Sequence, residues 1–314
     1  MIRRCLFCYK PLAETDNDFH AACSKKMFGD TRTPLLPYTE NDLEKMAEEV
    51  IRSHTSVTGV QPKLSLHLTS GKDADSTKRF TIAGLWGGFI LKPPTPHYPQ
   101  LPEVEDLTMH LAEVVKIKTV PHSLIRLQSG NLAYVTKRID RINKTKLHME
   151  DMCQLTERLT ENKYQGSYEQ IAKAIQKYSS HPGLDVVNFF ESVVFSFITG
   201  NADMHLKNFS LIRLPNVGVV LSPAYDLVST TMVNPADKEE TALNLNGKKH
   251  KIKKSDFINA FTTLKLEKKQ QLNILNKMLS AEQAWMDLIK MSFISEEFKE
   301  KYIHLIKNRL EIFK

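Results

Sequence analysis

Residues 184 to 200, LDVVNFFESVVFSFITG, constrain the fold most, because their helical pattern is apolar on nearly every side. The residues that produce this pattern are Val187, Phe190, Val193, Val194, Phe197 and Ile198. A helix of this composition must be buried. The rest of the chain therefore has to form a body around it, and 314 residues, 41% of them hydrophobic, can bury a sizeable core.

Polar residues begin directly where this helix ends, in GNADMHLKNF. Asp203 and Asn208 are five positions apart, which is the spacing of the protein-kinase catalytic loop, where the Asp takes the substrate hydroxyl proton and the Asn binds magnesium. Asp226 follows an apolar strand pattern and supplies a second carboxylate for a magnesium–ATP site. The alternative interpretation is a helix C-terminal turn in which Asp203 and Asn208 only satisfy loop backbone groups.

The local patterns predict an α+β fold with two lobes. Thr39 and Asp42 form a capping box for a helix that ends near His54, and strand patterns follow at 63–70, 79–84 and 87–92. A helical pattern covers 102–117, and strand patterns cover 122–130 and 132–140. From His148 onward we expect helices, interrupted by short strands at 209–214 and 217–223. The expected domains are a Cys/His cap at 1–37, a β-rich N-lobe at 38–140 and a helical C-lobe at 141–314.

The expected N-lobe also contains elements that a nucleotide site needs. HTSVTGVQPK (54–63) offers a small-residue turn with exposed backbone N–H groups, and FILKPP ends a strand at Lys92. Taken singly, the first can be a simple turn and the second a solvated strand end. Their order along the chain, before the buried helix and the Asp203 loop, is the order of parts in a bilobal kinase.

Several blocks together resemble the HipA family of bacterial serine/threonine kinase toxins: SVTGVQPKLSL, FILKPP, VTKRIDR, HMEDMCQLTERLTENKY, GNADMHLKNFSL and LSPAYDLVS. The resemblance runs from about residue 50 to the C-terminus. The chain is shorter than full-length members, and in this it resembles the short HipT form of HipBST-type systems. Motifs of eukaryotic kinases such as His-Arg-Asp and Asp-Phe-Gly are absent from the sequence, and Tyr225-Asp226-Leu227 stands at the last position.

The resemblance implies roles for individual residues. Asp203 would be the catalytic base, while Asn208 and Asp226 would bind magnesium. Lys92, His205 and Lys207 would contact the nucleotide phosphates. The other implied nucleotide-binding residues are Thr58, Gly59, Val60, Gln61 and Lys63 of the phosphate-covering loop, Lys137 and Ile139 at the hinge, and Tyr225. Ser56 or Thr58 would be autophosphorylated, and the added phosphate would pull the loop away from ATP.

The resemblance also implies a toxin of a toxin–antitoxin system that uses ATP and Mg²⁺. Its implied target is a protein of translation, with an aminoacyl-tRNA synthetase favoured. Its implied partners are a helix-turn-helix antitoxin of the HipB kind, which would supply any contact with DNA, and a small HipS-like protein. The alternatives are a catalytically silent kinase-like module that binds antitoxin and DNA, and a small-molecule phosphotransferase.

Charge and composition agree with a cytoplasmic protein that has no membrane segment. The sequence has no apolar run of the ~18 residues that a membrane span requires. Lys and Arg exceed Asp and Glu by 43 to 36, which gives a net charge of +7. Because this excess is modest and spread along the chain, it favours a solvated basic exterior over a direct nucleic-acid surface.

Cysteine and histidine residues near the N-terminus form a separate pattern. Cys5 and Cys8, followed by His20 and Cys23, have the residue types and spacing of a tetrahedral zinc site. The alternative is a set of reduced cysteines that pack a small N-terminal cap. Cys153 is expected to be a buried helix residue without chemistry.

Overall fold

The computed structural model describes residues 3–53, 63–69, 77–83, 87–142, 145–236 and 238–314. The chain forms two compact units. Unit 1 comprises residues 1–106, 120–139 and 291–293, and unit 2 comprises residues 107–119, 140–290 and 294–314. The predicted domain limits at residues 37 and 140 stay a prediction.

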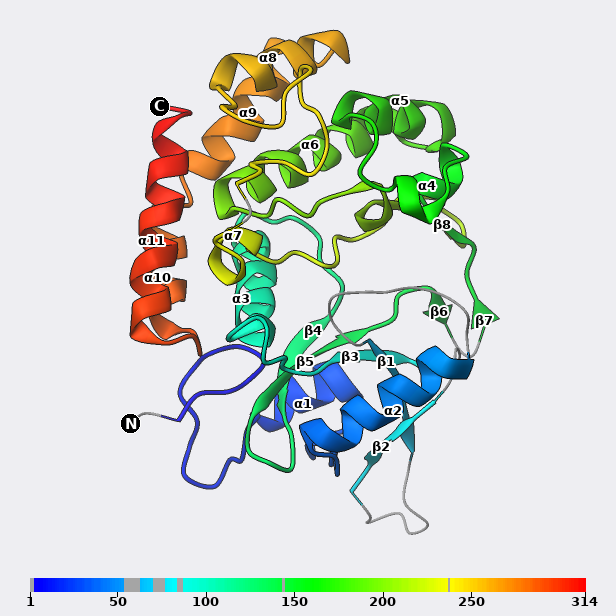
Figure 1. The fold of residues 1–314 in the computed structure, drawn as a ribbon, viewed down its shortest axis with the longest axis vertical. Coiled ribbons are helices and arrows are strands. Elements are labelled where there is room, and N and C mark those ends of the chain that lie inside the picture. Colours follow the sequence, from blue (N-terminus) through cyan, green and yellow to red (C-terminus); the bar gives the residue numbers. More distant parts are fainter. Residues whose placement is uncertain (1–2, 54–62, 70–76, 84–86, 143–144, 237) are drawn as a thin grey trace. The chain divides into compact units, whose positions relative to one another are not determined.

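Unit 1 is built on an antiparallel sheet with the strand order β2-β1-β3-β5-β4 (Figure 1). The strands are β1 Leu64–Thr69, β2 Arg79–Ile82, β3 Phe89–Lys92, β4 His122–Arg126 and β5 Leu132–Lys137. In β1, Leu64 and Leu66 are buried while His67 is exposed, as expected for a strand with one face on a core. The strand predictions for this part of the chain are therefore confirmed.

Helices α1 Ala21–Phe28 and α2 Glu40–Ser53 precede this sheet, and α3 Leu101–Val114 follows β3. The predicted capping box of α2 is present: the Thr39 N–H donates to the Asp42 carboxylate at 2.9 Å, and the Asp42 N–H donates to the Thr39 hydroxyl at 3.3 Å. The sequence analysis did not predict α1.

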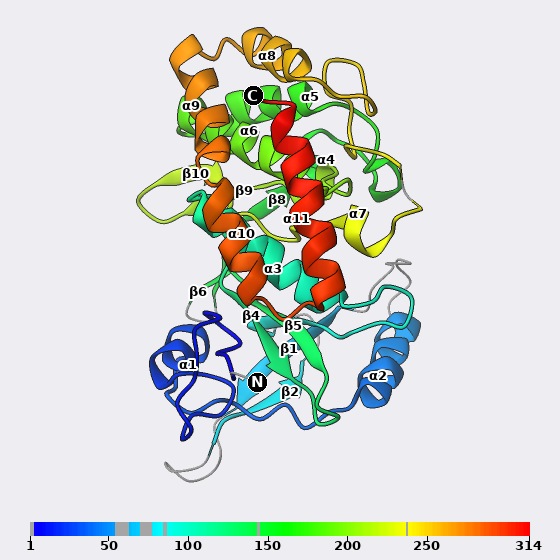
Figure 2. The same ribbon diagram turned by 90° about the vertical axis from the view of Figure 1, so that its left-hand side faces the viewer.

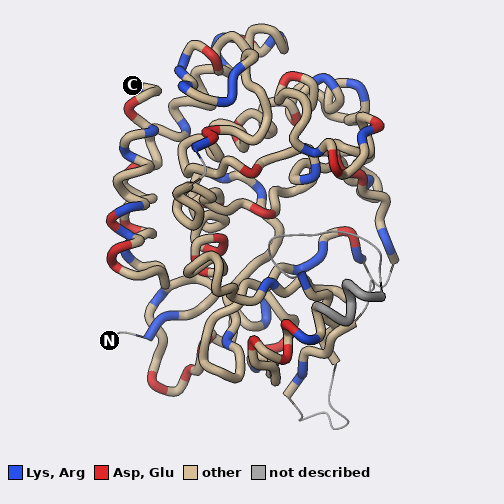
Figure 3. The backbone as a smooth tube through the Cα atoms, viewed as in Figure 1, with Lys and Arg blue, Asp and Glu red and all other residues tan. Residues whose placement is uncertain are grey.

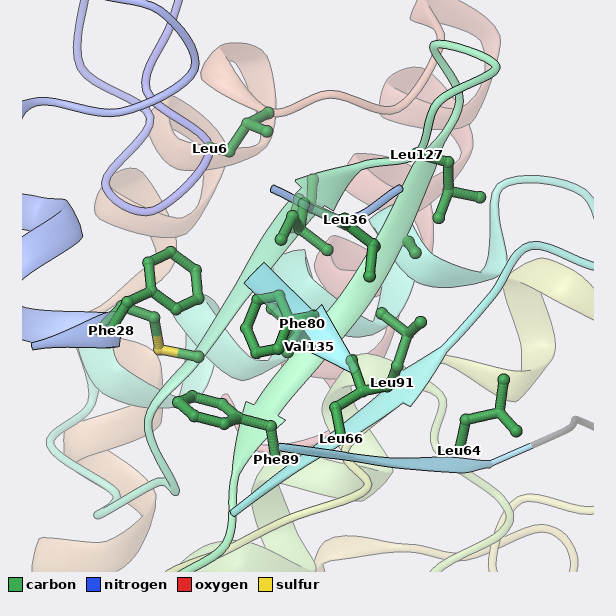
Figure 4. Packing of buried hydrophobic residues seen from close by; sticks show 14 of the residues in the cluster. Leu6, Phe28, Leu36, Leu64, Leu66, Phe80, Phe89, Leu91, Leu127 and Val135 are labelled. Carbon is green, nitrogen blue, oxygen red and sulfur yellow. The ribbon is translucent and has the colours of Figure 1, made fainter. Parts of the chain in front are cut away.

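The N-terminal residues share one hydrophobic core with the sheet, as Figure 4 shows. The Phe28 ring meets the Phe80 ring edge to face, with 5.8 Å between centroids, and Phe80 meets Phe89 in the same way at 5.3 Å. Leu6 is fully buried in the same cluster. Because aromatic pairs add to the free energy of burial, the cap is an integral layer of unit 1.

Unit 2 is mainly helical. Its larger helices are α5 Tyr168–Tyr178, α6 Pro182–Thr199, α8 Lys254–Thr263, α9 Lys268–Leu279, α10 Glu282–Met291 and α11 Glu296–Glu311, and its short ones are α4 Met152–Leu155 and α7 Thr230–Val233. The order β10-β9-β8 joins Gly218–Leu221, Ser210–Leu214 and Met149–Asp151, and β6 Arg141–Ile142 pairs with β7 Thr145–Lys146. The prediction of helix from His148 is wrong at its start, because Met149–Asp151 pairs with β9. The Asp151 carboxylate then caps α4 by accepting the Gln154 N–H at 3.0 Å, so the helix cannot begin earlier.

Helix α6 is the buried helix predicted from the sequence, and it contacts α5, α9 and α11 (Figure 2). Its Phe190 ring lies 5.1 Å from that of Phe261, and its Phe197 ring 5.3 Å from that of Phe257. The helix ends at Gly200, which adopts a left-handed conformation with φ of 71°. The large apolar surface of α6 therefore fixes the point at which the Asp203 loop begins.

Helix α11 carries charged residues of both signs, and Figure 3 shows both signs in this part of unit 2. Lys299 pairs with Glu296 and Lys301 pairs with Glu297 on this helix. Surface pairs of this kind add little stability, but they keep the helix surface solvated. Among the described residues, no helix combines the length and apolarity needed to cross a membrane.

We predict that Gly200→Ala destabilises unit 2 more than Gly29→Ala destabilises unit 1. Both glycines end helices with nearly equal φ, 71° and 72°. An alanine in this left-handed conformation therefore lowers the free energy of unfolding by about 1 kcal/mol in either variant. A Cβ at Gly200 would also lie 2.7 Å from Leu305 Cδ2 and 2.9 Å from Thr231 Oγ1, whereas a Cβ at Gly29 meets nothing within 4 Å. The expected loss of unfolding free energy in urea is about 2 to 4 kcal/mol for Gly200→Ala. Equal losses in the two variants would contradict this account.

Candidate active site

The loop between α6 and β9 carries the predicted catalytic residues of unit 2, and its start is fixed by backbone bonds. The Gly200 N–H donates to the Phe197 and Ser196 carbonyls, and the Asn201 N–H donates to Ser196 at 2.8 Å. The Ala202 N–H donates to the Thr230 hydroxyl at 2.9 Å. The polar residues that follow therefore sit on a rigid support.

Tyrosine hydroxyl groups hold the remainder of the loop. The Tyr168 hydroxyl donates to the Met204 carbonyl at 3.2 Å from a fully buried position at the start of α5. The Tyr225 hydroxyl donates to the Lys207 carbonyl at 3.0 Å and is also hydrogen-bonded to Ser210. Tyr225, predicted to bind the nucleotide, thus has a structural role in positioning the loop.

Asp203 and Asn208 come together as the sequence spacing predicts. The Asn208 Nδ2 donates to the Asp203 carbonyl at 2.9 Å, which leaves the amide oxygen as the acceptor of this side chain. The alternative interpretation, that these side chains only satisfy loop backbone groups, agrees with Asn208, whose amide donates to a loop carbonyl. It is not met for Asp203, whose Oδ1 accepts the Tyr164 hydroxyl at 2.6 Å and whose side chain is 43% exposed.

His205 lies behind this carboxylate in a buried position. Its Nε2 is 4.0 Å from Asp203 Oδ1, and within the described residues its Nδ1 has no hydrogen-bond partner. Burial lowers the pKa of His205, although the carboxylates of Asp203 and Asp226 act in the opposite direction. The imidazole is therefore neutral at pH 7, and both acids lie within electrostatic range of it.

Asp226 has a backbone conformation that few residues adopt, with φ of 58°. The chain just before it is held by the Ala224 N–H, which donates to the Lys118 carbonyl at 2.7 Å. Unusual backbone conformations of this kind cluster at functional sites. The backbone conformation of Asp226 is therefore consistent with a residue whose carboxylate must take a defined direction.

Lys207 has a partner that the sequence analysis did not predict. Its ammonium group lies 2.8 Å from Asp151 Oδ2, and its side chain is 36% exposed. Asp151 thus links the loop to the start of α4, which it also caps. Contact of Lys207 with a phosphate would have to share or replace this ion pair.

Lys92 belongs to unit 1 and forms a buried ion pair with Glu105 of α3. The two charged groups are 2.5 Å apart, with side-chain exposures of 6% and 1%. Lys92 also lies over the Tyr134 ring, 5.4 Å from its centroid. A strand lysine paired with a glutamate of the following helix is the arrangement that active protein kinases require.

The structure describes only some of the other residues predicted to contact the nucleotide. The Lys137 N–H donates to the Pro121 carbonyl at 2.8 Å, so adenine binding there would have to use other backbone groups of Lys137 and Ile139. Lys63 is exposed just before β1. Ser56, Thr58, Gly59, Val60 and Gln61 lie outside the described residues.

Tyr164, Tyr168, Glu105 and Asp151 are site residues that sequence reasoning missed. Tyr164 belongs to a block quoted for the resemblance, but 39 positions separate it from Asp203. Glu105 belongs to the helix predicted at 102–117, whose acidic residues were given no role. A signal existed for Glu105, since a kinase-like strand lysine requires an acidic partner on the next helix.

The sequence of this chain is similar to those of curated proteins named as kinases. The candidate kinase Y4dM of Sinorhizobium fredii is 34% identical over 187 residues, which cover 56% of this chain and 45% of that protein. The serine/threonine-protein kinase toxin HipA of Shewanella oneidensis is 28% identical over 204 residues, 59% of this chain and 45% of that protein. The chain spans about half the length of these curated relatives.

Solved structures with the same fold include HipA in its complex with HipB and operator DNA from Shewanella oneidensis. It matches with a TM-score of 0.66 and 21% identity over 96% of this chain and 79% of that one. The proinflammatory kinase CtkA of Helicobacter pylori matches with a TM-score of 0.55 and 16% identity over 80% of this chain and 94% of that one. The predicted α+β, kinase-like fold is thereby confirmed.

The resemblance noted in the sequence is confirmed by a family match. The HipA-like C-terminal domain family matches residues 55–285, well over half of the 314 residues. This chain belongs to the HipA-like C-terminal domain family.

Proposed function

We propose that this chain is a cytoplasmic serine/threonine protein kinase that uses ATP and Mg²⁺ and acts as the toxin of a toxin–antitoxin system. The observation that carries the proposal is the Asp203 loop. It presents a half-exposed carboxylate on a backbone that Tyr168, Tyr225 and Thr230 hold in place. A loop held so firmly around an accessible acid suits proton transfer, which requires a positioned base.

In the proposed reaction, Asp203 accepts or orients the proton of the substrate hydroxyl as that oxygen bonds to the γ-phosphorus of ATP. The bond between this phosphorus and the β–γ bridging oxygen breaks, and ADP leaves. Tyr164 orients the carboxylate through its bond to Oδ1. The neutral imidazole of His205 adds no positive charge behind the base. Lys92, held by Glu105, engages the α- and β-phosphates.

The residues present fit a magnesium ion. The Asn208 amide oxygen and the Asp226 carboxylate are hard oxygen ligands. Because Asn208 bonds the Asp203 carbonyl through Nδ2, its own side-chain oxygen is not used in that bond. Asn208 and Asp226 would hold the ion. When bound, such an ion neutralises the negative charge on the transferred phosphoryl group.

The toxin role and the partners are further parts of the proposal, supported by family membership and by the fold shared with HipA of Shewanella oneidensis. We propose a HipB-like helix-turn-helix antitoxin and a HipS-like small protein as partners, with DNA bound through the antitoxin. The proposed substrate is an aminoacyl-tRNA synthetase. Autophosphorylation at Ser56 or Thr58 would inactivate the enzyme, because a dianion near the ATP phosphates is repelled.

The kinase proposal is tested with labelled ATP. Wild-type protein is expected to label itself, and Asp203→Asn is expected to reduce labelling at least about 100-fold, since it keeps the shape of the base but removes its basicity. Asp287→Asn changes an exposed acid on α10 and serves as the control with unchanged labelling. Undiminished labelling in Asp203→Asn would remove the proposal, as would phosphate found only on a small molecule.

Tyr164→Phe tests whether the hydroxyl orients the base. Losing one hydrogen bond to a charged group costs about 1.5 kcal/mol, so the expected result is a fall in kcat of about 10-fold with little change in KM for ATP. Tyr178→Phe is a matched control, because Tyr178 is 39% exposed and Tyr164 is 42% exposed. An unchanged kcat in Tyr164→Phe would show that the hydrogen bond has no role in turnover.

A double-mutant cycle on Lys92 and Glu105 separates stability from activity. Glu105→Gln leaves the Lys92 charge buried and is expected to lower the free energy of unfolding by about 3 kcal/mol. Adding Lys92→Met removes that charge and should recover most of the stability without restoring phosphorylation. A double variant that is no more stable than Glu105→Gln, or that still phosphorylates, would be inconsistent with the assigned role.

A further inference from the structure

Four potential ligand atoms gather in the N-terminal cap of unit 1. The sulfur atoms of Cys5, Cys8 and Cys23 and a ring nitrogen of His20 all lie within 4.8 Å of one another. The Cys8 sulfur is 3.5 Å and the Cys23 sulfur 3.7 Å from His20 Nδ1. In a tetrahedral zinc site with Zn–S of ~2.3 Å and Zn–N of ~2.05 Å, the sulfur and nitrogen ligands are about 3.5 Å apart. The observed separations therefore match the edges of one coordination tetrahedron.

The His20 ring is oriented as a metal-binding histidine would be. Its Nε2 lies 3.0 Å from the Pro11 carbonyl oxygen, which can only accept a hydrogen bond. Nε2 therefore carries the proton, and in the neutral imidazole the Nδ1 lone pair points toward the sulfurs. Metal-binding histidines are usually fixed in this way by a hydrogen bond from the ring nitrogen that does not bind the metal.

The backbone around the first two cysteines forms a tight turn that brings both sulfurs to one side. The Tyr9 N–H donates to the Cys5 carbonyl at 2.9 Å, and Tyr9 adopts a left-handed conformation with φ of 60°. The turn therefore places the sulfur atoms of Cys5 and Cys8 where one metal ion could bind both.

We propose that Cys5, Cys8, His20 and Cys23 bind one Zn²⁺ ion in tetrahedral coordination. Three soft sulfur ligands and one imidazole suit zinc and exclude the hard cations Mg²⁺ and Ca²⁺. The proposal does not depend on the proposed kinase activity, because it rests on the cap alone.

The zinc site would fix a contact with α3. The Tyr9 side chain, one residue after Cys8, donates its hydroxyl to Asp106 Oδ2 at 2.7 Å. Asp106 follows Glu105, the partner of Lys92, and its Oδ1 lies 2.7 Å from His122 Nδ1. A metal that holds the turn at Tyr9 therefore also holds the segment of α3 that positions Lys92.

Metal analysis of the purified 314-residue chain is the first test, with an expected content of about one zinc per chain. Cobalt substitution should give the visible absorption of a tetrahedral site with thiolate ligands. Cys8→Ser should lose zinc, while Cys153→Ser, which changes a buried cysteine of unit 2, should keep it. His20→Cys should also keep zinc, because four cysteines form an equally good site.

A chelator experiment on the wild type covers the case in which Cys8→Ser does not fold. Removing the metal should lower Tm by about 5 °C or more, and adding Zn²⁺ should restore it. Wild-type protein that carries no zinc and gives no cobalt spectrum would overturn the proposal. Fewer than four free thiols in the unfolded, metal-free protein would also overturn it, since this would indicate a disulfide.

Discussion

The candidate active site of unit 2 depends on hydroxyl groups that hold a backbone loop from outside it. Tyr168 and Tyr225 bind carbonyls of the loop, and Thr230 accepts an N–H near its start. The loop in turn begins where the buried helix α6 must end, at Gly200. Because buried backbone groups are costly to leave unpaired, these bonds fix the direction in which Asp203 and Asn208 project. A functional carboxylate can then remain partly exposed without the loop losing its shape.

In unit 1, a buried ion pair holds a side chain in place as the hydroxyl groups do in unit 2. Lys92 and Glu105 are both buried, and each would be costly alone, so the pair holds the lysine in a defined place. The neighbouring Asp106 accepts from Tyr9 and pairs with His122, which connects α3 to the N-terminal cap. The cap, the sheet and α3 are thus joined by specific polar contacts as well as by the shared hydrophobic core.

Much of the fold could be predicted because local patterns decided it. The burial of α6 followed from its composition, and the start of α2 followed from the Thr39 and Asp42 pair. The prediction failed at Met149–Asp151, where pairing with a distant strand outweighed the local helical pattern. In the site, the spacing of Asp203 and Asn208 could be read directly. Tyr164 could not be assigned, because its contact with Asp203 depends on how the chain folds back on itself. A partner for Lys92 could have been sought among the acidic residues of the next predicted helix, where Glu105 lies.

The central claim is that the Asp203 loop and Asp226 surround the terminal phosphates of a bound nucleotide. The most direct measurement is a crystal structure with Mn²⁺ and a non-hydrolysable ATP analogue, with the metal located by its anomalous scattering. The account predicts an anomalous peak about 2.0 to 2.3 Å from the Asn208 amide oxygen and the Asp226 carboxylate, with Asp203 facing the γ-phosphate. A nucleotide bound elsewhere, or a metal that contacts neither Asn208 nor Asp226, would contradict it.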